Sequence, residues 1–322
     1  MTVNITIIGL GQVGTSIGLA LAAYPDKVHR TGHDRRFEQA NKAHNLGALD
    51  KFEINLPRSV EDADLVILSL PMHEIEETLR IIAPDLRDSC VIVDTAPYKE
   101  PVAAWFQTHV GAGRHYVGLV PALSPHHITE LERPFHADLF KGGVVGLVNL
   151  PGTPGDAVKL AADLVTPLGA EPFFMDMLEA DNLMASSHLL PQLLSAALLD
   201  MTIDFSGWQE MRRLAGRPYA AATLSSASQD EPKALAHAVL ANPQASLRAM
   251  DAYIQTLTAL RTAIAVGEED ELVRRFEQAQ TGRDKWWQER TTGDWLKVEM
   301  GRTELPKKSN FMGRLFGMGK VK

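Results

Sequence analysis

Cysteine is nearly absent from this sequence: Cys90 is the one cysteine among 322 residues. A disulfide within the chain is therefore excluded, and such a composition is typical of a reducing compartment, so we expect a cytoplasmic protein. Long apolar runs are missing as well, because no uninterrupted stretch reaches the roughly 20 residues of a membrane span. The first residues lack a basic stretch followed by an apolar one, so we expect no signal peptide and no stable membrane association.

Positive charge is in deficit. The sequence has 32 Lys and Arg against 40 Asp and Glu, which gives a formal net charge of −8. Nucleic acids bind to basic surfaces, so this balance argues against a nucleic-acid partner. The histidines show no metal-ligand spacing and no cysteine cluster exists, so we predict no metal site. The P-loop lysine motif and the Gly-x-Ser-x-Gly elbow are also missing.

The first half of the sequence alternates between apolar strands and helical segments. With 45% hydrophobic residues, a chain of this length can bury the cores of more than one domain. Strands separated by helices predict a doubly wound parallel sheet of the Rossmann type, an α/β fold. The predicted strands are 5–8, 28–34, 65–68, 91–93, 144–148 and 171–175, and the predicted helices are 15–23, 37–45 and 74–83.

The second half changes to long helices. Apolar residues recur there at spacings of three and four, as in Leu247, Met250, Ile254 and Leu257, which indicates amphipathic helices. The predicted helices are 178–200, 209–214, 232–240, 243–266 and 269–290. We therefore predict a dinucleotide-binding domain over residues 1–175 and an all-α domain over residues 176–292.

The segment 293–322 differs from both domains. Its part Lys297–Lys322 holds seven basic and two acidic residues, a net charge of +5. Such a composition favours a disordered, solvated tail. The alternative is that Phe311–Phe316 forms a short amphipathic anchor for a membrane surface or a partner.

A glycine-rich turn carries the strongest chemical signal. The motif Gly9-Leu10-Gly11-Gln12-Val13-Gly14 directly follows a predicted strand and opens a predicted helix. In this context its glycines allow a tight turn, close approach of a pyrophosphate to the backbone, and close packing of the helix on the strand. The helix N-terminus offers free N–H groups to the phosphates. We therefore predict a dinucleotide site.

An acidic residue follows at the expected distance. Asp34 ends the second predicted strand, 20 residues after Gly14, where a carboxylate accepts hydrogen bonds from the adenosine ribose of NAD. Arg35 and Arg36 follow and could pair with the 2′-phosphate of NADP, so NADP stays open beside NAD. Strand ends also line such a crevice, which places Leu70, Pro71 and Thr95 near the cofactor.

These motifs resemble the prephenate and arogenate dehydrogenase family, which carries out the oxidative step of tyrosine biosynthesis. The resemblance runs from Ile5 to about Trp287 and is most specific in the second half. There, Ser187-His188-Leu189-Leu190-Pro191-Gln192 resembles the family's Ser-His-Leu-Pro-His helix, and Arg212-Arg213-Leu214-Ala215 resembles its Thr-Arg-Ile-Ala segment. The resemblance implies a Rossmann domain, a helical domain that forms a homodimer, and a small carboxylate substrate.

The family reaction is an oxidative decarboxylation in which a histidine accepts a hydrogen bond from the reacting hydroxyl. The matching position here is Val120, which cannot make that bond, and a family serine matches Pro97. His126, His127 and His188 are the candidates to replace the lost group. By resemblance, Arg213 would hold the substrate carboxylate, with Ser187, Gln192 and Lys99 as further polar contacts.

Three functions stay open. The first is an NAD(P)-dependent dehydrogenase of the prephenate and arogenate type, or a relative acting on another hydroxy acid. The losses at Val120 and Pro97 motivate the second, a dinucleotide-binding sensor or partner protein without this chemistry. The third is a β-hydroxyacid or imine reductase, because a Rossmann half alone does not fix the reaction.

Overall fold

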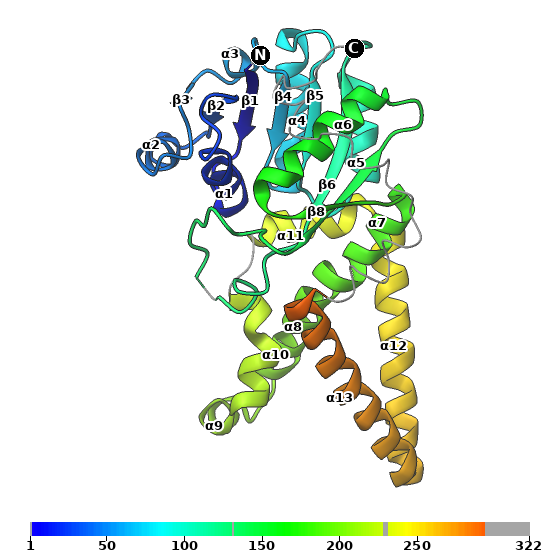
Figure 1. Ribbon diagram of the computed structural model, residues 1–322. Coiled ribbons are helices and arrows are strands. Elements are labelled where there is room, and N and C mark those ends of the chain that lie inside the picture. Colours follow the sequence, from blue (N-terminus) through cyan, green and yellow to red (C-terminus); the bar gives the residue numbers. More distant parts are fainter. Residues whose placement is uncertain (1, 131, 228–230, 294–322) are drawn as a thin grey trace.

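The structure is a computed structural model that describes residues 2–130, 132–227 and 231–293. Figure 1 shows a sheet domain at one end and a set of long helices at the other. The predicted tail lies outside the described residues, apart from Gly293, and so does the proposed anchor Phe311–Phe316. In the described part of the chain, no helix is long and apolar enough to cross a membrane.

The first domain is built on one eight-stranded sheet in the order β3-β2-β1-β4-β5-β6-β7-β8. The strands are β1 (Val3–Ile8), β2 (Val28–His33), β3 (Lys51–Phe52), β4 (Leu65–Leu68), β5 (Val91–Asp94), β6 (His115–Pro121), β7 (Val144–Asn149) and β8 (Glu171–Phe174). The predicted α/β fold is confirmed. The prediction of a parallel sheet is corrected at one pair, because β7 runs antiparallel to β6.

The central strands are apolar because helices cover both faces of the sheet. All four residues of β4 and of β5 are buried. Ile7 and Ile67 pack into the core on one face, whereas Ile8 and Val66 pack into the core on the other. Continuous apolar runs are therefore what this position in the sheet requires.

Helices of the first domain connect the strands. They are α1 (Gln12–Leu21), α2 (Phe37–Asn45), α3 (Leu56–Val60), α4 (Met72–Ile82), α5 (Glu100–His109) and α6 (Gly155–Val165), with the short turns η1 (Ala83–Asp85) and η2 (Thr166–Leu168). The predicted helices 15–23, 37–45 and 74–83 correspond to α1, α2 and α4. Three helices, α3, α5 and α6, are additional.

The second domain is helical from Met177 onward, three residues after β8 ends. Its elements are α7 (Met177–Met184), the π-helical turn η3 (Ala185–Leu189), α8 (Leu190–Ile203), α9 (Trp208–Leu214), α10 (Arg217–Ala227), α11 (Pro232–Ala241), α12 (Pro243–Val266) and α13 (Glu269–Thr292). Figure 1 shows α12 and α13 as a long hairpin and α9 beyond α10, away from the sheet. The predicted helix 178–200 is thus divided by a π-helical turn.

Candidate active site

The predicted cofactor residues meet at one edge of the sheet. Strands β1, β2, β4 and β5 are neighbours and parallel, so their carboxyl ends lie together. Gly9 N donates to His33 O at 2.9 Å, and Ser69 N donates to Ile8 O at 2.8 Å. Residues 9–14, Asp34, Leu70, Pro71 and Thr95 all follow these ends, where ligands of doubly wound sheets bind.

The three glycines of the turn have different environments. Gly9 has φ +90°, and a Cβ there would lie 2.2 Å from Ser69 O. A Cβ on Gly14 would lie 2.0 Å from Gly9 O, whereas no atom lies within 4 Å of one on Gly11. Packing of the protein therefore requires Gly9 and Gly14. Gly11 borders open space, where a ligand can approach the protein backbone.

The turn presents a free helix N-terminus beside that space. Helix α1 begins at Gln12 with Gly11 as its N-cap, and no side chain caps it. Its first N–H groups are therefore available to an anion, and the helix dipole favours negative charge there. Leu10 is fully buried and Val13 packs on the core, so both hold the turn in place.

Asp34 is fixed against this turn. Its Oδ2 accepts a hydrogen bond from Leu10 N at 2.9 Å, and its Oδ1 accepts one from Arg36 N at 2.9 Å. The neighbouring Arg35 forms an ion pair with Glu74 on α4. The Arg35 guanidinium thus already has a carboxylate partner, which favours NAD over a 2′-phosphorylated cofactor.

A buried polar network lies beneath the end of β5. Lys99 Nζ lies 2.7 Å from Asp94 Oδ1, and Tyr116 Oη donates to Asp94 Oδ2 at 2.7 Å. Burial lowers the pKa of Lys99, which Asp94 opposes, and burial raises the pKa of Tyr116. A Cβ on Gly118 would lie 2.5 Å from Lys99 Cδ, so the lysine side chain occupies the space beside Gly118. Lys99, a predicted substrate contact, is thus buried in an ion pair with Asp94.

Asp181 of α7 joins the two domains. Its carboxylate accepts hydrogen bonds from Lys99 N at 2.6 Å, Glu100 N at 3.2 Å and Asn242 Nδ2 at 2.9 Å. The first two donors lie at the N-terminus of α5, where a carboxylate satisfies free N–H groups. Burial raises the pKa of Asp181, and these hydrogen bonds oppose the rise. Sequence patterns did not single out Asp94, Tyr116 or Asp181.

His188 and Ser187 lie on the π-helical turn η3, and both are exposed. Gln192 Nε2 donates to His188 O at 3.0 Å and lies 3.4 Å from His188 Nε2. The Gln192 side chain is buried, so it positions the turn from within the helix. Single π-helical turns occur frequently at functional sites because they redirect side chains.

Arg213 lies elsewhere in the chain. It is exposed on α9, which follows the far end of α8, whereas His188 precedes the near end. Helix α8 has 14 residues. At about 1.5 Å per residue, the two side chains are separated by roughly 20 Å along the helix. A single chain therefore does not bring Arg213 and His188 together.

Val120 and Pro97, the two positions at which the sequence motifs suggested a departure from the family, are at the same sheet edge as the dinucleotide turn. Val120 is near the end of β6, where it pairs with Gly146, and Pro97 lies in the turn after β5. His126 and His127 lie in the loop 122–143 that follows β6. His126 is exposed, whereas His127 is hydrogen-bonded through both ring nitrogens, to Glu130 at 3.0 Å and Asp138 at 3.1 Å.

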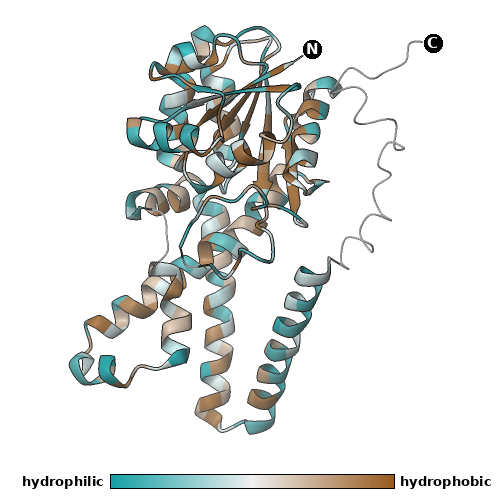
Figure 2. Ribbon diagram, turned by 60° about the vertical axis from the view of Figure 1, so that its left-hand side comes forward, coloured by the Kyte–Doolittle hydropathy of each residue, from teal (hydrophilic) through white to brown (hydrophobic). Residues whose placement is uncertain are grey.

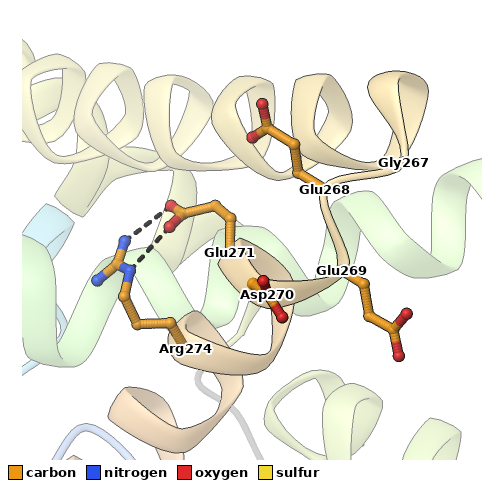
Figure 3. A pocket seen from close by; sticks show the side chains of 6 residues that line it. All are labelled: Gly267, Glu268, Glu269, Asp270, Glu271 and Arg274. Atoms are coloured by element: carbon orange, nitrogen blue, oxygen red, sulfur yellow. Dashed lines mark hydrogen bonds and ion pairs between the residues drawn. The ribbon is translucent and has the colours of Figure 1, made fainter.

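An open hollow at the α12–α13 turn is lined by none of the predicted site residues. It is lined by Gly267, Glu268, Glu269, Asp270, Glu271 and Arg274. Figure 3 shows Arg274 paired with Glu271, while Glu268 and Glu269 point away from that pair. These carboxylates complement the N-terminal dipole of α13, so their role is structural.

Two family models together match most of the chain. The model of the prephenate dehydrogenase nucleotide-binding domain matches residues 17–173, and that of the prephenate dehydrogenase dimerization domain matches residues 178–278. The cyclohexadienyl dehydrogenase of Zymomonas mobilis is 30% identical over 285 residues, which cover 87% of this chain and 94% of that protein.

Solved structures share the fold. Prephenate dehydrogenase of Aquifex aeolicus, solved in complex with hydroxyphenyl propionate and NAD+, superposes with a TM-score of 0.79 at 23% identity, covering 88% of this chain and 98% of that one. Synechocystis arogenate dehydrogenase superposes with a TM-score of 0.70 at 21% identity, covering 88% and 99%. Taken with the matches along the sequence, these findings show that the chain belongs to the prephenate dehydrogenase family of NAD-dependent oxidoreductases.

Proposed function

We propose that the protein uses NAD+ to oxidise a small hydroxy acid of the prephenate or arogenate type. The observation that carries this proposal is the dinucleotide turn, in which Gly11 borders open space at a free helix N-terminus and Asp34 is locked beside it. Bound NAD+ would supply the nicotinamide ring as the hydride acceptor. The family resemblance adds loss of the substrate carboxyl group as carbon dioxide.

The residues have separate tasks in this proposal. The N–H groups at the start of α1 bind the pyrophosphate, and Asp34 accepts hydrogen bonds from the adenosine ribose. Leu70, Pro71 and Thr95 contact the ribose or nicotinamide from the ends of β4 and β5. The ion pair between Arg35 and Glu74 supports NAD as the preferred cofactor.

His188 is our candidate for the group that holds the reacting hydroxyl. Val120 offers no hydrogen bond, and both ring nitrogens of His127 are engaged by carboxylates. His188 is exposed on a π-helical turn that Gln192 supports from within. His126 is the alternative, since it is exposed in the loop after β6.

A homodimer formed by the helical domain completes the proposal. Large apolar side chains are exposed along its helices, among them Met201 (68%), Leu214 (84%) and Ile264 (66%). Figure 2 shows such hydrophobic residues along these helices. Exposed apolar surface of this extent marks an interface. Because Arg213 is remote from His188 within one chain, we propose that it reaches the substrate bound by a second copy.

Turnover of prephenate and of arogenate, each with NAD+ and with NADP+, tests the function. We expect NAD+-dependent activity in the unmodified protein, and its loss in His188→Asn with NAD+ affinity retained. The matched variant His126→Asn should keep its activity. Val120→His restores the family residue and should raise kcat if the substrate is the family's own.

A mixed dimer tests the arrangement of Arg213. Co-expressed His188→Asn and Arg213→Ala chains, each inactive alone, should recover about a quarter of wild-type activity. In random mixing half of the dimers are mixed, and one of their two sites is intact. Absence of recovery would place Arg213 and His188 in the same site of one chain.

The losses at Val120 and Pro97 support a second candidate, a dinucleotide-binding sensor. It predicts tight NAD+ binding with no turnover of any hydroxy acid. Calorimetric binding of NAD+ beside the same turnover assays separates the two candidates.

A further inference from the structure

The loop 122–143 is tied to both domains. Gln12 Nε2 donates to Pro134 O at 3.1 Å, and His136 N donates to Ser16 Oγ at 3.1 Å, so the loop lies against α1. Lys42 of α2 lies 4.8 Å from the centre of the Phe135 ring. At the start of the loop, Leu123 O accepts a hydrogen bond from Arg290 of α13. The loop therefore borders the helix whose N-terminus forms the dinucleotide turn.

Two histidines and a carboxylate converge within this loop. Ligand atoms of His127, His136 and Asp138 all lie within 4.8 Å of one another. His127 Nε2 lies 3.1 Å from Asp138 Oδ1. The two imidazole rings are stacked face to face, with centroids 4.0 Å apart and planes inclined by 16°.

Glu130 forms a hydrogen bond with each of the two histidine rings. Its Oε1 lies 3.0 Å from His127 Nδ1 and its Oε2 lies 3.1 Å from His136 Nε2. A histidine that binds a metal through one ring nitrogen almost always donates the other N–H to a carboxylate or carbonyl. One glutamate here supplies that orienting hydrogen bond to two histidines, and one ion can bind both of them once the His136 ring turns out of the stack.

We propose that His127, His136 and Asp138 bind a divalent transition-metal ion such as Zn²⁺, with Glu130 orienting the two rings. Imidazole nitrogen and carboxylate oxygen are ordinary Zn²⁺ ligands, at distances of about 2.0–2.2 Å. Neighbouring ligands of a tetrahedral site then lie about 3.3 Å apart, close to the 3.1 Å between His127 and Asp138. His136 has to turn and to move toward them, from a separation of up to 4.8 Å to about 3.3 Å, and water takes the fourth position.

Charge favours the ion. Glu130 and Asp138 bring two carboxylates to two histidines, and hydrogen bonds from the histidines lower the pKa of Glu130. An ion between His127 and Asp138 replaces the proton that they share, and that proton is released to solvent. The ion joins residues 127 and 138 and thereby holds the loop against α1.

Calorimetric titration of the full, tag-free chain with Zn²⁺ tests the site. We expect one ion bound per chain, no binding at that site in His136→Gln, and unchanged binding in the neighbouring His126→Gln. Glu130→Gln should weaken binding by about 10- to 100-fold, the effect of losing an orienting partner of a metal ligand. This last variant keeps all three ligands and separates orientation from ligation.

Co²⁺ provides a readout that is independent of variant folding. Bound by the unmodified chain at the proposed site, Co²⁺ should give the visible absorption of a four-coordinate centre, which Zn²⁺ then displaces. No Zn²⁺ binding by the unmodified chain would overturn the proposal, and so would binding that His136→Gln leaves unchanged. Neither result depends on dehydrogenase activity.

Discussion

Lys99 Nζ and Asp94 Oδ1 lie 2.7 Å apart, and neither side chain has any exposed surface. Asp94 is the last residue of β5 and Lys99 directly precedes α5, at the sheet edge where the cofactor residues gather. Tyr116 Oη and Ala96 N also donate to Asp94, so the carboxylate has partners on both oxygens. The pair fixes the turn after β5, and Asp181 fixes its far end.

Lys99→Met should destabilise the protein strongly. It leaves a buried carboxylate without its counter-charge, which typically costs about 3–5 kcal/mol in unfolding free energy. Urea unfolding of the variant measures the change. The double variant Lys99→Met with Asp94→Asn should recover part of the loss, because no buried charge is then left unpaired. As a control, Arg80→Met breaks an exposed pair with Glu77 and should change stability by less than about 1 kcal/mol.

Alanine at Gly9 should lower the stability of the fold, whereas alanine at Gly11 should weaken cofactor binding. Gly9→Ala places a Cβ at positive φ and against Ser69 O, so the free energy of unfolding should fall by more than about 1–2 kcal/mol. Gly11→Ala meets no protein atom within 4 Å, so it should fold normally. It should nevertheless weaken NAD+ binding at least about tenfold, because its methyl group occupies the approach of the pyrophosphate. Unchanged NAD+ affinity in Gly11→Ala would contradict the proposed cofactor position.

Cofactor preference should depend on Asp34 and Glu74. Asp34→Ser removes the charge that repels a 2′-phosphate, and Glu74→Gln releases Arg35 to bind one. The double variant should therefore lower the ratio of kcat/KM for NAD+ to that for NADP+ by at least about tenfold. Asp34→Asn is the matched control, since it keeps an oxygen for Leu10 N or Arg36 N. Equal preference in all variants would mean that other residues select the cofactor.

His127 should make stability depend on pH. Partial burial lowers the pKa of His127, but the hydrogen bonds to Glu130 and Asp138 together raise it by more, so the net shift is upward. A raised folded-state pKa stabilises the protein fully below the unfolded value of about 6.5, and the contribution disappears as pH rises through the folded value. With a chelator present, the stability difference between the unmodified chain and His127→Gln should be larger at about pH 6 than at about pH 9. An equal stability difference at both pH values would contradict a raised pKa of His127.

Much of the sheet domain could be predicted because its signals are local. The apolar runs that became β4 and β5 are buried on both faces, so their composition alone marks them as central strands. The glycine motif fixed the strand, the turn and the helix together, and Asp34 followed at the expected distance. The direction of β7 could not be predicted, because apolar composition is the same for parallel and antiparallel strands.

The helical domain was harder to predict in detail. Helix α10 was not predicted because its sequence shows no apolar stripe. In a single chain none of its residues is buried. The π-helical turn η3 lies inside a segment whose composition is helical throughout, and one extra residue per turn leaves no periodic signature. The separation of Arg213 from His188 depends on how α8 and α9 are oriented, which spacing along the sequence does not contain.

The buried and clustered polar residues were missed for another reason. Asp94, Tyr116 and Asp181 lie on three separate elements, and the fold links them because Lys99 contacts Asp181 through its N–H and Asp94 through its ammonium group. His127, His136 and Asp138 lie in a loop without regular periodicity, and no metal was predicted from their spacing. The stacked rings become visible only when the loop is folded against α1.

The antiparallel pairing of β6 and β7 affects where the sequence of this protein can change during evolution. A parallel neighbour would need a crossover that returns the chain to the opposite edge of the sheet. The connection between the antiparallel strands β6 and β7 instead begins and ends at the sheet edge that holds the cofactor residues, and its described residues form no helix. Insertions and deletions between the buried residues Ser124 and Leu139 can therefore reshape the surroundings of the cofactor while the core stays the same.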